Sequence, residues 1–501
     1  MPDLKLIEAP PSDAERAAID AVVGVEADAG NRVSRRDRNR RQFLLPALRA
    51  AQRRVGWVTP GALGYASRRL DVPPAEAYGV ATFYALLSLE ERPPEVLHVC
   101  TDLACKLAGA QHPVPGTDCC VLPSPCLGLC ELAPASLRTI AGEEPREIQL
   151  PERRLPVDGD RLLKGFPAGA ALARARELGP EGVLDAIEQA GLLGRGGAAF
   201  PTAAKWRAVA QQPARPHYLV CNADESEPGT FKDRVLMEEQ PGAVVEAMAI
   251  AMLAADCEKG YIYIRAEYPL AQERIQAAIA VGDADIELRI GAGAYVCGEE
   301  TALFQSIEGY RGEPRNKPPF PVEVGLFGKP TVVNNVETLV NVPHILLGDA
   351  RPTRLFCLSG NVARPGLYER ELGTPLRELL ADAGAEPPQA VLLGGAAGTF
   401  LGPDELDIAL DFNVTLGSGV VMVFGENADL RGAIHSIADF FREESCGQCV
   451  PCRIGTVRQV EALHRDDRPV LAELAQVMRD ASICGLGQTA ASAVQSGLAL
   501  L

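Results

Sequence analysis

The chain has 501 residues, which is too long for one hydrophobic core, so we expect roughly three to five folding units. Apolar residues make up 47% and charged residues 23%, as in ordinary globular proteins. The formal charge of −17 argues against nucleic-acid binding, which needs a basic surface. The sequence shows neither an apolar run of about 18 residues nor an apolar signal near its start, so we expect no membrane span and a cytoplasmic location.

The first third of the chain is expected to hold a helical region, a cysteine-rich module and a linker. Apolar residues recur at helical spacing from residue 40 to about 92, which predicts helices there and a helical region over 1–94. A short strand at 96–99 leads into a proline- and cysteine-rich stretch, so that the module spans 95–140. The polar, proline-containing segment 141–166 is expected to be a linker.

In the remaining two thirds of the chain, the pattern of apolar residues changes twice. Residues 167–350 alternate helical patterns with β-rich runs such as HYLVCNAD and GYIYIRAEY, which is typical of a parallel α/β sheet. Residues 351–426 carry short strands with turn signals and predict a small β-rich module. Residues 427–501 are expected to be helical throughout.

The clearest chemical motif is a cysteine run near the C-terminus. Three cysteines follow C-x2-C-x2-C spacing, and a fourth lies downstream: Cys446, Cys449, Cys452 and Cys484. Three closely spaced thiolates and one distant thiolate suit a [4Fe–4S] cluster. A zinc site more often has two C-x2-C pairs, and buried structural thiols are the other alternative. We interpret the run as a cluster site.

A second set of cysteines lies in the first third of the chain. The pairs C-x4-C and C-x3-C supply four thiols, Cys100, Cys105, Cys126 and Cys130, which is enough for a [2Fe–2S] centre. A zinc site and a lost cluster stay open as alternatives. Clustered thiols in a reducing compartment indicate metal binding or catalysis, since disulfides rarely persist there.

Between the two cysteine sets lie four segments with polar residues, of which the first is rich in glycine. Glycines let backbone N–H groups approach a phosphate or flavin, and polar groups after a strand mark the ligand edge of an α/β sheet. An ordinary tight turn or a solvated acidic loop explains each segment singly, but not four together. The segments supply Gly194, Gly196, Gly197 and Lys205; Asn222, Asp224, Ser226 and Glu227; Tyr295, Gly298, Glu299 and Glu300; and Lys317, Phe320, Asn334 and Asn335.

These motifs together resemble the flavin- and NADH-binding subunit of respiratory complex I, a module shared with NAD-reducing hydrogenases and NAD-dependent, metal-containing formate dehydrogenases. The resemblance covers residues 165–495 approximately. Ahead of it, YGVATFY and the two cysteine pairs resemble the small thioredoxin-like [2Fe–2S] subunit of the same complexes. The chain therefore looks like a fusion of the two.

The resemblance implies a multidomain α/β fold. N-terminal helices would precede a trimmed thioredoxin-like domain at 95–140 and a Rossmann-like FMN/NAD(H) domain at 167–350. A ubiquitin-like β-grasp module of the SLBB type would occupy 351–426, and a helical bundle with the [4Fe–4S] cluster would occupy 427–501. The trimming is expected because only 20 residues separate Cys105 from Cys126. Ala199 and Ala203 also depart from the family, which usually has glycine there.

The resemblance also implies the ligand sets. NAD(H) would lie on the flavin, with its adenine between Phe200 and Phe320, and with Glu227, Glu300 and Lys317 along the nicotinamide and ribose. Glu227 and Glu300 are assigned the catalytic role of tuning the flavin potential and product release. FMN would contact Gly194, Gly196, Gly197, Lys205, Asn222, Asp224, Ser226, Tyr295, Gly298, Glu299, Asn334 and Asn335.

The implied activity is that of a diaphorase subunit in a hetero-oligomer. Hydride would pass between NAD(H) and FMN, and single electrons would pass through the [4Fe–4S] centre to or from a partner subunit. We favour a molybdopterin formate dehydrogenase as the partner. A nickel–iron hydrogenase and a complex I-like NADH dehydrogenase are alternatives, and a cofactor-less or zinc-bound assembly subunit is an alternative of a different class.

Overall fold

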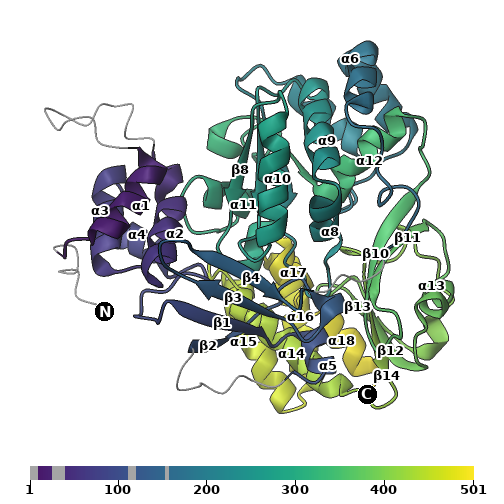
Figure 1. Cartoon of the computed structure of the whole chain (residues 1–501). Coiled ribbons are helices and arrows are strands. Elements are labelled where there is room, and N and C mark those ends of the chain that lie inside the picture. Colours follow the sequence, from purple (N-terminus) through teal and green to yellow (C-terminus); the bar gives the residue numbers. More distant parts are fainter. Residues whose placement is uncertain (1–8, 25–39, 111–119, 153–156) are drawn as a thin grey trace, which may run out of the picture.

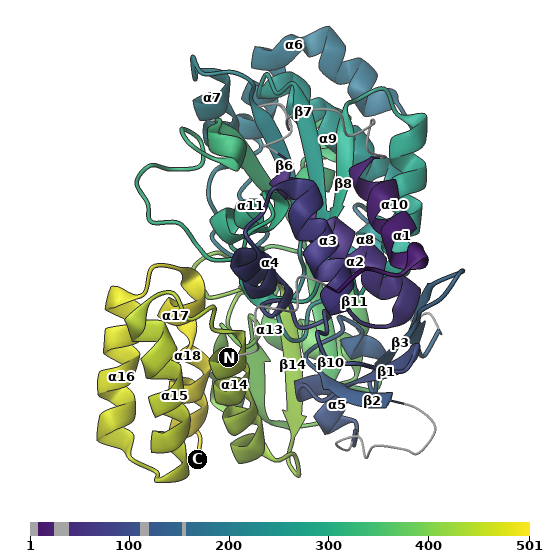
Figure 2. The same cartoon turned by 90° about the vertical axis from the view of Figure 1, so that its left-hand side faces the viewer.

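The computed structural model describes residues 9–24, 40–110, 120–152 and 157–501. Figure 1 shows a central α/β layer with a helical group on one side and a second sheet on the other. Figure 2 shows the C-terminal helices as a separate group below this layer. None of the helices in the described ranges is long and apolar enough to cross a lipid bilayer. The predicted multidomain α/β class is confirmed.

The central layer is a four-stranded parallel sheet in the order β8-β7-β6-β9. Strands β6 and β7 are buried over most of their length, as expected for a parallel sheet covered on both faces, whereas the edge strand β8 carries Glu287 and Arg289. Chain order reverses between β6 and β9, so this pair forms the switch point at which doubly wound sheets bind ligands. The strands are β6 (Tyr218–Ala223), β7 (Lys259–Ile264), β8 (Ile286–Ile290) and β9 (Thr331–Asn335).

One face of this sheet is covered by helices from the same segment of chain. The helices α6, α9 and α12 pack against one another, and α10 packs on α9. Apolar side chains from this layer belong to the largest buried cluster. The helices of the whole segment are α6 (Ala170–Gln189), α7 (Thr202–Ala210), α8 (Lys232–Glu239), α9 (Pro241–Ala254), α10 (Pro269–Val281), α11 (Glu300–Ile307) and α12 (Val336–Leu346), with η5 (Tyr295–Gly298) and η6 (Leu326–Gly328) between them. Of these, α11 packs mainly with the N-terminal helices.

The opposite face of the sheet is covered by the N-terminal helices. Their buried residues form one cluster with Val220, Tyr261 and Phe304 of the central layer. The phenol of Tyr84 donates to Ser306 Oγ at 2.9 Å, which ties the two parts together. The N-terminal helices therefore complete the core of the α/β layer. They are α1 (Asp13–Val23), η3 (Arg41–Phe43), α2 (Leu44–Val55), α3 (Pro60–Leu70) and α4 (Pro74–Ala81).

The N-terminal cysteines belong to a module built on a small mixed sheet of order β2-β1-β3-β4, with Cys100 at the end of β1 and the other three in the segments beside the sheet. Strand β4 comes from the segment that we expected to be a linker, and the two-residue strand β5 pairs with β11 of another sheet. Part of 141–166 is therefore structured. The elements are β1 (Glu95–Cys100), α5 (Leu103–Leu107), β2 (Cys120–Ser124), η4 (Cys130–Leu132), β3 (Ser136–Ile140), β4 (Arg146–Leu150) and β5 (Val157–Asp158).

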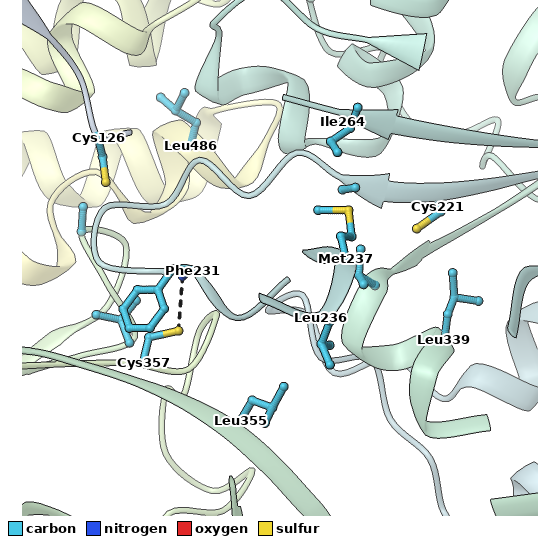
Figure 3. Packing of buried hydrophobic residues seen from close by; sticks show 14 of the residues in the cluster. Cys126, Cys221, Phe231, Leu236, Met237, Ile264, Leu339, Leu355, Cys357 and Leu486 are labelled. Carbon is cyan, nitrogen blue, oxygen red and sulfur yellow. Dashed lines mark hydrogen bonds between the residues drawn. The ribbon is translucent and has the colours of Figure 1, made fainter. Parts of the chain in front are cut away.

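The β-rich module is a mixed sheet of order β13-β12-β14-β10-β11-β5, and α13 shares a buried cluster with its strands. Figure 3 shows how it joins the central layer: the Phe231 backbone N–H donates to the buried Cys357 thiol, with 3.3 Å between N and Sγ. The elements are β10 (Thr353–Gly360), β11 (Gly366–Glu371), α13 (Leu376–Ala383), β12 (Pro388–Leu393), β13 (Thr399–Leu401), η7 (Pro403–Glu405) and β14 (Val420–Gly425).

The chain ends in a group of helices, as expected. Helices α15 and α16 pack as a pair, and α18 packs against both α14 and β13. The helices are α14 (Leu430–Glu444), α15 (Val450–His464), α16 (Arg468–Ala481), α17 (Gly485–Thr489) and α18 (Ser492–Ala499). The domain boundaries given above stay predictions.

Candidate functional site

A cavity of about 590 Å³ lies at the switch point of the parallel sheet. Asn222 of β6 is paired with Asn335 of β9, so the carboxyl ends of these strands meet at the cavity. This volume is within the range of cofactor and substrate pockets. The position and size together make the cavity the candidate cofactor site.

Most residues that we assigned to FMN line this one cavity. They come from the loop before α7, the end of β6, the turn η5 and the end of β9, which are distant in sequence. The lining residues from that set are Gly196, Gly197, Asn222, Asp224, Ser226, Tyr295, Gly298, Glu299 and Asn335. Glu227, assigned to the nicotinamide side, lines it too.

Three residues of the assigned set are outside this lining. The backbone N–H of Gly194 donates to the carbonyl of Phe200 at 3.0 Å and closes the glycine loop. The carboxamide oxygen of Asn334 accepts from the Trp206 indole at 2.7 Å, which is a packing role. The ammonium of Lys205 donates to the carbonyl of Val333 at 3.2 Å.

The backbone of the glycine loop has a geometry that lets a ligand approach it closely. Gly197 has φ +131°, and Ala199 has φ +50°, both in the region that favours glycine. The loop therefore retains a left-handed conformation at Ala199, where the family usually has glycine. A residue other than glycine in that conformation costs about 1–2 kcal/mol.

Burial raises the pKa of two carboxyl groups in the cavity towards neutral pH. Burial raises the pKa of Asp224 to about 7, and the Ser226 hydroxyl donates to this carboxylate at 3.0 Å. Burial also raises the pKa of Glu227 to about 7, against hydrogen bonds from the Tyr295 phenol at 2.6 Å and the Ala397 N–H at 3.0 Å. Both groups are therefore able to change charge near physiological pH.

One fixed positive charge lies among the lining residues. Burial lowers the pKa of Lys232, but the carboxylates of Asp233, Glu337 and Glu225 raise it more and leave it well above its ordinary value. Its ammonium is 2.7 Å from Asp233, 3.1 Å from Glu337 and 3.3 Å from Asn335 Oδ1. Sequence reasoning missed Lys232, although it follows the acidic motif by five positions.

Two walls of the cavity were also missed from the sequence. One wall comes from the glycine-rich turns of the β-rich module, and the other from helix α17. The motifs LGGAAG and TLGSG could have signalled the first wall, because glycines there leave room for a ligand. The wall residues are Gly394, Ala397, Thr415, Gly417 and Ser418 from the first, and Gly485, Leu486, Gln488 and Thr489 from the second.

Beside the cavity, a second group of charges surrounds Lys317. Its ammonium is 2.9 Å from Glu299 and 2.6 Å from Glu300, and Lys205 is 3.9 Å from Glu300. Glu299 also caps helix α11 by accepting from the N–H groups of Thr301 and Ala302. The structure thus pairs Lys317 with Glu300, two of the three charged residues that we assigned to the nucleotide, while the third, Glu227, lines the cavity.

Phe200 and Phe320 are unusually exposed for large apolar residues, at 53% and 52%. The Lys205 ammonium lies 5.6 Å from the centroid of the Phe200 ring. Exposed aromatic faces are suited to stacking on a planar ring. Their exposure is compatible with the adenine contact that we assigned to them.

The C-terminal thiols gather where three helices begin or end. Cys446 follows α14, Cys449 is the N-cap of α15, and Cys484 is the N-cap of α17. Burial, with a smaller contribution from the other three thiols, raises the pKa of the Cys452 thiol to about 12. The four thiols thus lie within electrostatic reach of one another. Because Cys484 caps α17, the same short helix borders both the cysteine site and the cavity.

The N-terminal thiols are all buried. Cys126 and Cys130 are 3.3 Å apart at sulfur, and Cys100 is hydrogen-bonded to Cys105 and Cys126. Within the described ranges, no three histidine, cysteine or carboxylate side chains at either site are arranged to hold a single metal ion. Four thiols at each site form the donor set that an iron–sulfur centre uses.

Known families match four stretches of the chain. Residues 187–344 match the Nuo51 FMN-binding domain, and residues 432–500 match the NADH-ubiquinone oxidoreductase-F iron–sulfur binding region. Residues 31–119 match the thioredoxin-like [2Fe–2S] ferredoxin, so that this match includes α2–α4, and residues 355–396 match the SLBB domain.

Two similar curated proteins are subunits of different enzymes. The NADP-reducing hydrogenase subunit HndC of Solidesulfovibrio fructosivorans is 40% identical over 66% of this chain and 76% of its own length. An NADH-quinone oxidoreductase subunit of Aquifex aeolicus is 40% identical over 66% and 86%. This chain belongs to their family. It is a subunit of the flavin- and iron–sulfur-dependent oxidoreductases that the motifs resembled.

Two further matches extend over nearly the whole chain. The alpha subunit of the NAD-reducing hydrogenase HoxS of Cupriavidus necator is 32% identical over 91% of this chain and 90% of its own length. The crystal structure of an NAD⁺-reducing [NiFe]-hydrogenase in the air-oxidized state is 33% identical, with a TM-score of 0.83 over 93% of each chain. The family's cofactors, namely FMN, NAD(H), [4Fe–4S] and [2Fe–2S], agree with those predicted.

Proposed function

We propose that the chain exchanges hydride between NAD(H) and FMN at the cavity and passes electrons out through the Cys446, Cys449, Cys452 and Cys484 site. The observation that carries this proposal is the shared helix α17, which lines the cavity and is capped by Cys484. FMN, when bound, supplies hydride exchange and release of single electrons.

The chain's own residues would then bind and orient the FMN. The backbone of Gly196 and Gly197 leaves room for close approach, and the buried Lys232 offers a positive charge beside Asn335. The carboxyl group of Glu227 is fixed by Tyr295 and Ala397, so it would present one defined face to the cavity. These residues position the ligand and exclude water; none needs to form a covalent bond.

For the nucleotide, we propose that Lys317 and Glu300 bind the ribose and nicotinamide side. Replacing Lys317 with Met removes its charged hydrogen bonds, and such bonds contribute about 1.5–3 kcal/mol each. We expect KM for NADH to rise at least about tenfold, with flavin content unchanged. Lys259→Met is a matched control, since Lys259 pairs with Glu287 at the start of β7. An unchanged KM would contradict the assignment.

The alternative of a zinc-bound or cofactor-less assembly subunit makes a different prediction. Metal, acid-labile sulfide and FMN analysis of the purified chain should give iron, sulfide and flavin. Zinc without flavin would overturn the proposed redox function.

For the partner, we propose a catalytic iron–sulfur subunit of a molybdopterin formate dehydrogenase or of a nickel–iron hydrogenase. The sequence motifs led us to favour formate dehydrogenase, and the full-length similarity to HoxS subunit alpha supports hydrogenase equally. Purification of the intact complex, with nickel and molybdenum analysis and NAD⁺ reduction by formate or hydrogen, separates the two. We also propose a cytoplasmic location, since clustered free thiols suit a reducing compartment.

A further inference from the structure

A buried arginine, Arg265, joins the loop that carries Cys126 and Cys130 (the cysteine loop) to the α/β domain. This residue directly follows β7, and only 4% of it is exposed. Its Nη2 donates to the carbonyl of Cys126 at 2.6 Å, and its Nη1 donates to the carbonyl of Glu225 at 2.6 Å. Because Glu225 lines the cavity, Arg265 bridges the cavity wall and the cysteine loop.

Arg265 is paired with one carboxylate, Glu267, at 2.8 Å. Glu267 is 5% exposed, and its other oxygen has no hydrogen-bond partner among the described residues. The Arg265 guanidinium also lies 5.1 Å from the centre of the Tyr268 ring. Both members of this ion pair are thus buried beside the cysteine loop, where charges act over longer distances than in water.

The loop is also fixed at a second point. Arg234 donates from Nε to the carbonyl of Gly128 at 3.0 Å and forms ion pairs with Glu131 and Glu238. Gly128 has φ +65° and packs against Tyr268, where a side chain would meet the phenol oxygen. The loop therefore has little freedom to move away from Arg265.

We propose that Arg265 and Glu267 are positioning residues that set the reduction potential of an iron–sulfur centre at Cys126 and Cys130. The inference rests on the assignment of these cysteines as cluster ligands. Reduction adds one negative charge to the centre. A buried guanidinium bonded to the Cys126 carbonyl stabilises that charge, whereas the buried carboxylate of Glu267 opposes it.

The two charges predict shifts of opposite sign. Arg265→Gln removes the positive charge and should make the [2Fe–2S] potential more negative. Glu267→Gln removes the negative charge and should make the potential more positive. The double variant loses both charges and should return towards the wild-type value. A purely structural role would not produce opposite shifts that cancel.

The test is a potentiometric titration of the [2Fe–2S] signal by electron paramagnetic resonance on the full chain. Arg265→Lys keeps the charge and should stay close to wild type. Arg161→Gln is a matched control, since Arg161 is 1% exposed and binds Asn341 and Thr353 instead of the cysteine loop. It should lower thermal stability without moving the potential.

The outcomes separate this inference from the assignment on which it rests. If Cys126→Ser retains the [2Fe–2S] signal, the ligand assignment is wrong. If that signal is lost in Cys126→Ser, but Glu267→Gln retains both signal and wild-type potential, the inference is overturned. Should Arg265→Gln fail to fold, Glu267→Gln and Arg265→Lys still decide the question.

Discussion

The two cysteine sites of this chain differ in how they reach the flavin cavity. The C-terminal site lies at helix ends, and its Cys484 caps the helix that lines the cavity. The N-terminal site is buried beside a small sheet of its own, and the backbone carbonyl of its Cys126 is connected to the cavity wall through the side chain of Arg265. One site borders the cavity, and the other is connected to it by hydrogen bonds.

On the proposed function, similar donor sets would serve different positions in an electron path. A short helix shared between cavity and thiols suits a centre that receives electrons directly. A site connected through a buried ion pair suits a side centre, whose potential the protein adjusts by nearby charge. Substitutions at each site and in the cavity test that contrast.

The largest effect is expected for Cys452→Ser. Cys452 is 5% exposed and lies within the first turn of α15, so its loss leaves three thiols for the cluster. Since changes in the groups around a metal's ligands already reduce metal affinity about 10–100-fold, removal of a ligand should abolish binding of this cluster. Electron transfer from NADH to the partner subunit should be lost, while an artificial dye that accepts at the flavin is still reduced.

Cys257→Ser is the control, because Cys257 is an isolated, partly buried thiol. It should keep full iron content and partner reduction. Retention of partner reduction in Cys452→Ser would place the exit of electrons elsewhere.

A smaller effect is expected from the carboxyl groups in the cavity. Burial raises the pKa of Glu227 to about 7 from an ordinary value of 4.5. Between these values the folded protein holds a proton that the unfolded chain has released, so the stability of the flavin-free protein should fall as pH rises through this window. The loss is at most about 3 kcal/mol for this group. Glu227→Gln should reduce the fall.

Melting temperatures of the flavin-free protein at several pH values between about 4.5 and 8 measure this effect. Glu443→Gln is a suitable control, because Glu443 is exposed. An identical pH profile for wild type and Glu227→Gln would mean that water reaches this carboxyl group.

The smallest effect on turnover is expected for Cys126→Ser. The N-terminal site should lose its [2Fe–2S] signal, but NADH-driven electron transfer through the C-terminal site should stay near wild type. Enzyme turnover and the two cluster signals, measured on the same preparation, check this. A loss of turnover comparable to that of Cys452→Ser would make the N-terminal site part of the main path.

Much of this organisation follows from local sequence. Cysteine spacing identified both thiol sets, and the alternation of helices with strands such as β6 and β7 predicted the parallel sheet. The resemblance assigned the glycine loop and the polar residues near β6 and η5 to one ligand, and these segments line one cavity. Such features depend on neighbours within a few residues, so the sequence displays them directly.

Other features depended on contacts between distant segments. The glycine-rich turns of the β-rich module are a local signal, but nothing local indicated that they and α17 would meet at this cavity, or that the N-terminal helices would cover the second face of the sheet. Cys126 and Arg265 are 139 positions apart, yet they share a hydrogen bond. The spacing of the cysteines in the sequence therefore determined by itself which kind of centre the chain can bind. Only packing decided how each site is connected to the cavity, because burial and buried charge arise from segments that meet after folding.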